Sequence, residues 1–358
     1  MGKIKFTDKN GSFVIENPEN YSGLYLPLAG EMGLKSNITP SMAGDAKTDQ
    51  NHFLLEPVSI ENLHNNKNGR NFWCRIEENG IWSVSGASAL QEAEKFTASQ
   101  DESKIEAGLM WQKLTRISKK YGIKSEVLSF VPTDKNIEIM YVTLENTSAE
   151  SIKFTPVAAI PLYGRSADNI RDHRHVTSLL HRISTQEYGI EVSPVLSFDE
   201  RGHQKNSTTY FVYGSKEDGT KPETFYPTNE MFIGEGGSFL NPEAVRTVKE
   251  GVKAGAKIQG KEAVGALAFE SVELKAGEKT GYIVVAGITD DVLEIEKTTV
   301  LYRTKEAVLE CFENTKRHWV EKVNIDFEMN DDLVDNYLKW ICFQPILRRI
   351  YGCSFLPY

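Results

Sequence analysis

The chain has 358 residues, of which 40% are hydrophobic and 25% charged, and its formal net charge is −9. This composition is typical of a globular protein with a large core and more than one structural unit. The acidic balance argues against a nucleic-acid surface, which needs clustered Lys and Arg. No apolar run approaches the roughly 20 residues of a membrane span. The N-terminus, MGKIKFTDKNGSF, lacks the apolar segment of a signal peptide, so we expect a cytoplasmic protein.

The first part of the chain has the pattern of short antiparallel strands. Residues 3–15 form two apolar runs around the turn signal Asp8 to Gly11, which predicts an opening hairpin. Short strands are expected at 23–27 and 52–56, with the polar stretch 31–51 between them as a long loop. FWCRI and IWSVS then flank a second hairpin turn. Longer runs predict strands at 109–116, 123–131, 137–144 and 152–160.

The later strands complete a sandwich pattern. Further runs at 188–196, 208–214, 264–273 and 281–287 are separated by turn residues. Long strands at regular spacing, each apolar on one face, indicate an antiparallel sandwich rather than βαβ units. The sequence therefore predicts a mainly β protein built on a large antiparallel β-sandwich.

Two helices are predicted after about Leu301, where the apolar period changes. Val308, Phe312, Trp319 and Val323 share one helical face. A second helix begins after Asn330 to Asp332, which offers an N-cap and carboxylates in the first turn. Leu333, Tyr337, Trp340 and Ile341 are expected on its buried face, and Pro345 should kink or end it.

Ionisable side chains are most concentrated in residues 163–182, which contain three histidines, four arginines and two aspartates. A metal is not expected there, because His173 and His175 lack the following Glu of a cupin site, no HExxH motif occurs, and the arginines would repel a cation. Arg and His donors beside Asp acceptors suit a polyhydroxylated or anionic ligand. The alternative is a salt-bridged loop that braces the sandwich or a subunit interface.

Candidate residues for a substrate cleft or an interface are therefore taken from this segment. No catalytic residue is assigned, since no GxSxG elbow is present and no carboxylate pair can be tied to glycoside hydrolysis. The glycine-rich run 232–239 lacks a P-loop pattern and predicts a tight structural turn. The candidates are Arg165, Asp168, Arg171, His173, Arg174 and His175.

Four longer strings carry a resemblance to a known family. They are YGRSADNIRDHRHVTSLLHRI, SFDERGHQKNSTTYFVYG, FIGEGGSFLNPEAV and YLKWICFQPILRRIYGCSFLPY. Together they resemble the N-terminal region of glycoside hydrolase family 94 phosphorylases, formerly glycosyltransferase family 36. The 1,2-β-oligoglucan phosphorylase branch is the nearest in likeness, and the resemblance covers essentially the whole chain.

The resemblance implies a three-part organisation and a reaction. Residues 1–300 would form the β-sandwich (a supersandwich), 301–327 a helical linker, and 328–358 the start of an (α/α)6-barrel catalytic domain. Such enzymes carry out inverting phosphorolysis of a β-glucan oligosaccharide and release α-glucose 1-phosphate. Inorganic phosphate is the co-substrate and no cofactor is implied, so one protein carboxylic acid suffices. A homodimer and contact with the chain's own C-terminal barrel are expected.

The departure from the family lies in length. In the family, the catalytic Asp and the phosphate-binding residues follow a segment like YGCSFLPY, so they would lie beyond Tyr358. We therefore expect an N-terminal, non-catalytic fragment that is inactive alone. The alternative is a stand-alone carbohydrate-binding β-sandwich, which would have no reason to end in an apolar, Trp-bearing helix. A cupin-like metalloenzyme is disfavoured by its missing ligand spacing.

Overall fold

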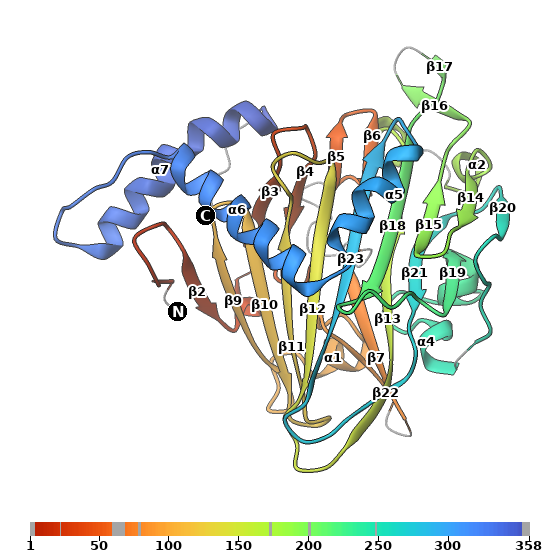
Figure 1. The fold of residues 1–358 in the computed structure, drawn as a ribbon, viewed down its shortest axis with the longest axis horizontal. Helices are drawn as coiled ribbons and strands as arrows, with labels where there is room; N and C mark the ends of the chain where they lie inside the picture. The colour runs from red at the N-terminus through yellow and green to blue at the C-terminus, as the bar shows by residue number, and fades with distance from the viewer. Residues whose placement is uncertain are drawn as a thin grey trace.

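The computed structural model describes residues 4–21, 23–58, 69–77, 80–171, 174–199, 202–247 and 249–352. Within these residues, the backbone alone is described for Arg171, Arg174, His175, Phe198 and Asp199. The described chain is mainly β, with helices concentrated at its C-terminal end (Figure 1). This confirms the predicted fold class.

An eleven-stranded antiparallel sheet dominates the described part of the chain (Figure 1). Its two longest partners, β12 and β23, lie at the middle and pair in register from Ile137↔Gly287 to Glu145↔Lys279. In spatial order the strands are β1 (Lys5–Phe6), β2 (Phe13–Glu16), β9 (Glu102–Gly108), β10 (Trp111–Ser118), β11 (Ile123–Phe130), β12 (Ile137–Asn146), β23 (Lys279–Thr289), β18 (Thr209–Lys216), β15 (Gly189–Val192), β14 (Arg182–Thr185) and β20 (Lys257–Gln259).

Smaller sheets complete the β-structure. The six-stranded sheet contains β19 (Thr224–Thr228), β21 (Ala263–Ala268), β13 (Ile152–Leu162), β7 (Asn71–Ile76) and β8 (Gly80–Ser83), with β22 (Val272–Leu274) paired to β13. A four-stranded sheet contains β3 (Leu26–Ala29), β4 (Lys35–Ile38), β5 (Ala46–Asp49) and β6 (His52–Leu55). β16 (Leu196–Asp199) and β17 (Gly202–Lys205) form a separate hairpin. The four-stranded sheet contacts strands of both larger sheets.

The main core lies between the large sheet and the smaller sheets, and it follows from strand alternation. Successive side chains of a strand point to opposite faces of the sheet. In β12, Met140 and Val142 enter the core between the sheets, whereas Ile139 and Tyr141 face the opposite side. The long apolar strands are thus buried on both faces.

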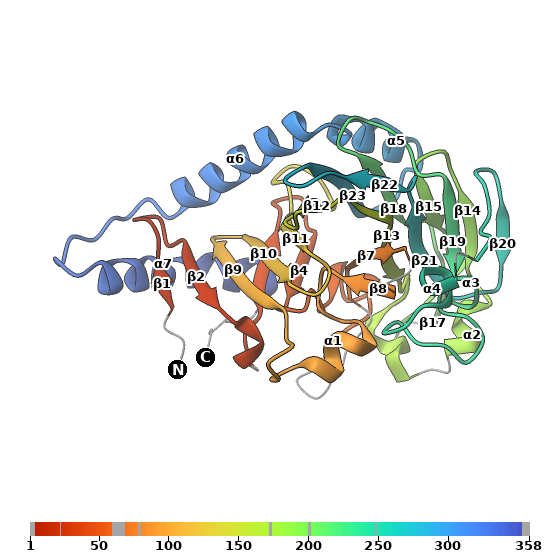
Figure 2. The ribbon, with the colours of Figure 1, turned by 90° about the horizontal axis from the view of Figure 1, so that it is seen from below.

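Helices cover the outer faces of the two large layers. α5 (Leu293–Thr299), η3 (Val300–Tyr302) and α6 (Lys305–Lys322) lie over the eleven-stranded sheet (Figure 2). α3 (Asn229–Ile233) and α4 (Glu243–Thr247) pack on the six-stranded sheet. The remaining helices are η1 (Pro18–Asn20), α1 (Ala89–Glu94), η2 (Ala167–Arg171), α2 (Arg174–Ser178) and α7 (Asp332–Tyr351). Over the described ranges, none of these helices has the length and apolar character needed to cross a membrane.

The predicted loop at 31–51 was wrong, because β4 and β5 lie within it. Because β4 and β5 contain many polar residues, their sequence did not predict strands. Buried hydrogen bonds stabilise both strands. The Ser36 hydroxyl donates to Glu138 of β12 at 2.7 Å and to the Asp45 carbonyl at 3.1 Å. Arg70 forms a buried ion pair with Glu138 and also bonds Ser36. Polar strand residues are satisfied here by side chains of other elements, a pattern that alternation does not reveal.

The two long helices match the prediction in part. Val308, Trp319 and Val323 of α6 are buried, as predicted. In α7 the carboxylate of Asp331 accepts hydrogen bonds from the amides of Leu333 (3.0 Å) and Val334 (3.3 Å), which confirms the N-cap.

The buried face expected for α7 was wrong for Leu333, Tyr337 and Ile341, which are exposed, whereas Trp340 packs against the core. The helix continues through Pro345 to Tyr351, so Pro345 does not end it. Its buried residues are Asn336, Lys339, Phe343 and Leu347, because this row of side chains meets the N-terminal hairpin and the end of α6. An apolar row is therefore left exposed, formed by Leu333, Val334, Tyr337 and Ile341. The domain limits 1–300, 301–327 and 328–358 stay predictions.

Candidate functional site

The His- and Arg-rich segment 163–182 connects the end of β13 to β14. Its first residues add an edge to the four-stranded sheet, since the Phe53 amide donates to the Arg165 carbonyl at 3.0 Å and the Gly164 amide to the Phe53 carbonyl at 3.0 Å. η2 and α2 follow. The segment therefore connects a strand of the six-stranded sheet, β13, to a strand of the eleven-stranded sheet, β14, through two short helices.

Arg165 lies at the base of this segment and is buried. Its Nη2 is 3.5 Å from the Oε1 atom of Glu262, and its guanidinium lies 5.1 Å from the ring centre of Tyr163. Glu262 also accepts a 2.7 Å hydrogen bond from Asn229. These contacts connect the segment to β21 and α3, so a buried polar cluster closes this end of the six-stranded sheet.

His181 lies at the other end of the segment and is fully buried. Burial, reinforced by the charge of Arg165, lowers the pKa of His181 to about 3. The ring is therefore neutral at neutral pH. Its Nδ1 lies 3.2 Å from the Lys261 carbonyl, which fixes the proton on Nδ1 because a carbonyl can only accept. A histidine in this state acts as a packed interior side chain rather than as a charged ligand contact.

The structure describes the side chain of only one of the other candidate residues, Asp168. Asp168 is exposed, and its amide donates to the Ser166 hydroxyl at 3.2 Å. The backbone places Arg171 in η2 and Arg174 and His175 in α2, and His173 lies outside the described residues. The connection also exposes three large apolar side chains, Ile170, Val176 and Leu179. The role of the six candidates at a cleft or interface stays a prediction.

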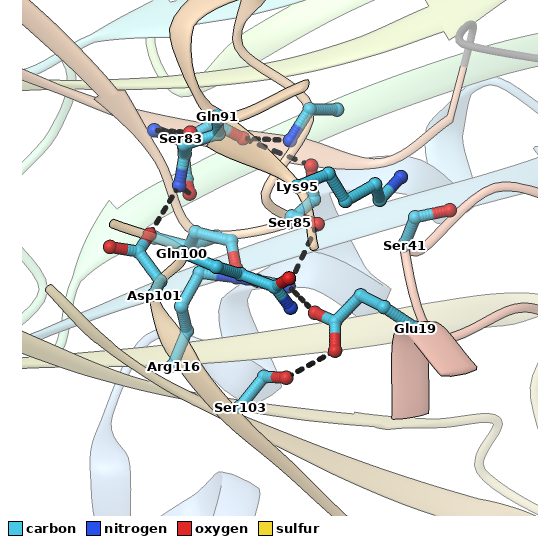
Figure 3. A network of polar contacts seen from close by, with 12 residues as sticks. Glu19, Ser41, Ser83, Ser85, Gln91, Lys95, Gln100, Asp101, Ser103 and Arg116 are labelled. Atoms are coloured by element: carbon cyan, nitrogen blue, oxygen red, sulfur yellow. Dashed lines mark hydrogen bonds and ion pairs between the residues drawn. The ribbon is translucent and has the colours of Figure 1, made fainter. Parts of the chain in front are cut away.

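A second candidate site, which the sequence did not reveal, is a pocket of about 220 Å³ between η1 and α1, lined by polar and apolar residues. Its floor is the buried ion pair of Arg116 Nη2 and Glu19 Oε1, 2.7 Å apart (Figure 3). Burial opposes the charge on Glu19, but Arg116 and the Ser103 hydroxyl outweigh it and lower the pKa of this carboxyl. Arg116 also donates to the Val84 and Ser85 carbonyls, at 3.3 and 3.4 Å.

The wall of this pocket is a second set of polar contacts from the strand β8 and the helix α1. The Nε2 atom of Gln91 donates to the Asp101 Oδ2 atom at 2.8 Å (Figure 3). The indole of Trp82 donates to the same oxygen at 2.8 Å. Gln91 also exchanges hydrogen bonds with the backbone of Ser83, at 2.9 and 3.0 Å. The pocket as a whole is lined by residues from 18–24, 39–41, 85–101 and 116, so no single sequence motif predicts it.

Within the described ranges, no group of three or more His, Cys, Asp or Glu side chains is arranged to hold a metal ion. The three cysteines of those ranges, Cys74, Cys311 and Cys342, are unbridged thiols, and burial raises the pKa of Cys74 and Cys311.

The layered architecture, two antiparallel sheets with a helical C-terminal extension, is that of the supersandwich domains found in carbohydrate-active enzymes. The sequence profile of the glycosyl hydrolase 94 supersandwich domain matches residues 41–305. The chain therefore belongs to glycosyl hydrolase family 94. A comparison with curated proteins gives no match.

Comparison with solved structures finds similar chains at low sequence identity. A bacterial glucoamylase complexed with acarbose is 8% identical, with a TM-score of 0.52, over 96% of this chain and 43% of the glucoamylase. A protein from the human microbiome assigned as a kojibiose phosphorylase is 9% identical, with a TM-score of 0.40, over 96% of this chain and 39% of that protein. The chain thus spans less than half the length of each. At this identity the likeness to the glucoamylase concerns the fold alone.

Proposed function

We propose that this chain is the N-terminal, non-catalytic part of an inverting β-glucan phosphorylase. The full enzyme would use inorganic phosphate to release α-glucose 1-phosphate from a β-1,2-linked glucan oligosaccharide, in the cytoplasm. The family membership supports this proposal, and the linkage rests on the resemblance of the four strings quoted above. In this account the catalytic Asp and the phosphate-binding residues belong to an (α/α)6 barrel that continues from α7.

The exposed row of α7 carries the proposal. Leu333, Tyr337 and Ile341 are 59%, 62% and 49% exposed, although they lie on a helix whose opposite side is firmly packed. An apolar stripe on a docked helix favours a further partner, since burying each such side chain contributes roughly 1.5–3 kcal/mol. The proposed partner is the remainder of the chain's own catalytic barrel.

The segment 163–182 has a second role in this account. Its base is held by Arg165 and His181, and its exposed part presents Ile170, Val176 and Leu179. We place this exposed part at the substrate cleft or at the cleft of a partner subunit in a homodimer. Replacing Arg171 and Arg174 by Ala in the barrel-containing enzyme should then weaken oligosaccharide use without lowering the melting temperature. Unchanged kinetics would contradict the cleft placement.

The experiment that tests the proposed function compares two chains. One is the 358-residue chain, and the other continues through a catalytic barrel. Only the longer chain should consume β-1,2-glucooligosaccharide in a phosphate-dependent reaction. Phosphorolysis by the shorter chain, or by neither, would contradict the proposal.

A further inference from the structure

In the pocket between η1 and α1, the charged groups at the floor have hydrogen-bond partners, whereas some polar atoms at the rim have none among the described residues. On the floor, Arg116 and Glu19 satisfy one another and neighbouring backbone and hydroxyl groups. At the rim, both hydrogen bonds to Asp101 reach Oδ2, so Oδ1 accepts none from the described residues. The Oε1 atom of Gln100 accepts from the Phe96 amide, whereas its Nε2 has no partner among those residues. The rim thus offers a free acceptor beside a free donor.

Lysine adds a further donor to the rim. The Lys95 Nζ atom lies 3.2 Å from Glu92 Oε1, and an ammonium group has three protons to donate. Ser41, which is exposed, lines the opposite side and contacts the Thr39 hydroxyl at 3.1 Å (Figure 3). The residues that line the pocket therefore offer both donors and acceptors. A ligand that carries several hydroxyl groups matches this pattern, because each hydroxyl both donates and accepts.

An aromatic ring completes the rim. Phe96 lines the pocket, is 69% exposed, and belongs to none of the apolar clusters of the described residues. Its φ is 63°, in the left-handed region that a bulky residue rarely occupies. Such a conformation costs of order 1–3 kcal/mol. Phe96 directly follows Lys95, the C-cap of α1, where a left-handed backbone is common. Its exposed ring provides a flat apolar face at the pocket for stacking.

The size of the pocket limits its occupant. Its volume of about 220 Å³ is below the roughly 300–1,000 Å³ of pockets for drug-sized ligands. A single sugar ring has the right combination of properties, with hydroxyls at its edge and an apolar C–H face. A larger or purely anionic ligand would leave Phe96 or Asp101 unused.

We infer that this pocket binds one pyranose unit of a carbohydrate, with Phe96 stacked on the ring and Asp101, Gln100 and Lys95 bonding its hydroxyls. The pocket is lined in part by α1, which lies on the side of the sandwich opposite to α5 and α6 (Figure 2). It would hold a sugar chain to the enzyme without taking part in bond cleavage. The inference that the pocket binds a sugar ring does not depend on the proposed function, whereas the choice of a glucosyl unit rests on it.

The test is titration of the 358-residue chain with D-glucose and with β-1,2-linked glucotriose, followed by calorimetry and saturation-transfer NMR. Phe96→Ala should weaken binding by at least about tenfold, whereas Phe96→Trp should retain it, because the larger ring still stacks. Gln100→Glu keeps the acceptor for the Phe96 amide but removes the Nε2 donor, and should weaken binding several-fold. Leu293→Ala, at a 74% exposed apolar residue of α5, is the matched control and should have no effect.

Two results would overturn the inference. Binding of neither sugar would do so, as would equal binding by the Phe96→Ala chain, whose melting temperature confirms that it is folded. Sorbitol, an open-chain polyol, should not compete, because it has no ring to stack on Phe96. A chain that binds no sugar yet supports phosphorolysis once joined to its barrel would contradict this inference and leave the proposed function intact.

Discussion

The indole nitrogen of Trp340 in α7 donates a 2.8 Å hydrogen bond to the carbonyl of Gly11, which turns the first hairpin of the chain. The Gly11 amide in turn donates to Asn336 Oδ1 at 2.8 Å. Gly11 has a φ of 83°, and a Cβ there would meet the Trp340 indole at 3.2 Å. The two ends of the described chain are therefore fastened to each other at one residue, which sets the direction in which α7 leaves the sandwich.

Trp340→Phe should loosen this fastening while leaving the sheets intact. The substitution keeps an aromatic ring near Phe13, 5.9 Å away in the native chain, but removes the donor to Gly11. We expect a loss of about 1–2 kcal/mol in the free energy of unfolding, with faster hydrogen exchange confined to α7 and the hairpin. Tyr337→Phe, on the exposed side of the same helix, is the control. Equal exchange in the Trp340→Phe and Tyr337→Phe chains would refute the role of this contact.

Glu31, in the turn between β3 and β4, connects the sandwich to both long helices. The hydrogen bond from Lys322, then those from His318 (3.3 Å) and Arg349 (3.0 Å), lower the pKa of Glu31 from 4.5 to about 2, against the opposing effect of partial burial. A carboxyl group whose pKa is lower in the folded state adds stability above its ordinary value, and this is lost as the pH falls. The stabilisation should therefore disappear between pH 4.5 and about 2.

The measurement is the melting temperature of the native chain and of Glu31→Gln from pH 7 downward. The variant should be less stable at pH 7 by about 1 kcal/mol, since the site is partly exposed and screened, and the difference should vanish as the acid range is crossed. Glu250→Gln, at an exposed carboxylate, serves as the control. A constant difference at every pH would rule out the ionised Glu31 as its source.

His181 predicts a different acid dependence. Its pKa is about 3 in the folded chain, below its ordinary value of 6.5, so the unfolded chain binds the additional proton between these values. Stability should consequently fall as the pH drops through this window, by up to about 1.4 kcal/mol per pH unit. His181→Gln should show a shallower slope over the same range, whatever its stability at pH 7. Leu293→Ala, at an exposed residue that does not titrate, should keep the native slope. Identical slopes in all three chains would argue against a buried neutral His181.

Periodicity predicted the elements whose stability comes from apolar burial. The long strands of the sandwich and the buried face of α6 with Val308 and Trp319 belong to this group. Periodicity did not predict the burial of residues that are held in place by polar contacts. Ser36 is buried on β4 because Arg70 and Glu138 reach it, and Asn336 is buried on α7 because it bonds Gly11. These partners are distant in sequence, so local patterns carry no sign of them.

The candidate sites follow the same division. The density of His and Arg marked the segment 163–182, yet Arg165 and His181 prove to be interior residues of the sandwich. The pocket near η1 depends instead on Glu19, Asp101 and Arg116, which only the folded sheets bring together. An exposed Phe96 with a left-handed backbone, two residues after the end of α1, is not a recognisable sequence signal. The amino-acid composition was therefore sufficient to single out the segment 163–182. The pocket near η1 could not be predicted, because its residues come together only in the folded chain.

The most direct measurement is the phosphate-dependent release of α-glucose 1-phosphate from β-1,2-glucooligosaccharide, with the product's anomeric configuration read by NMR. The chain extended through its catalytic barrel should release the α-anomer only when inorganic phosphate is present. The 358-residue chain should release none under the same conditions. Release by the shorter chain, a β-configured product, or hydrolysis to free glucose by the extended enzyme would each contradict the account.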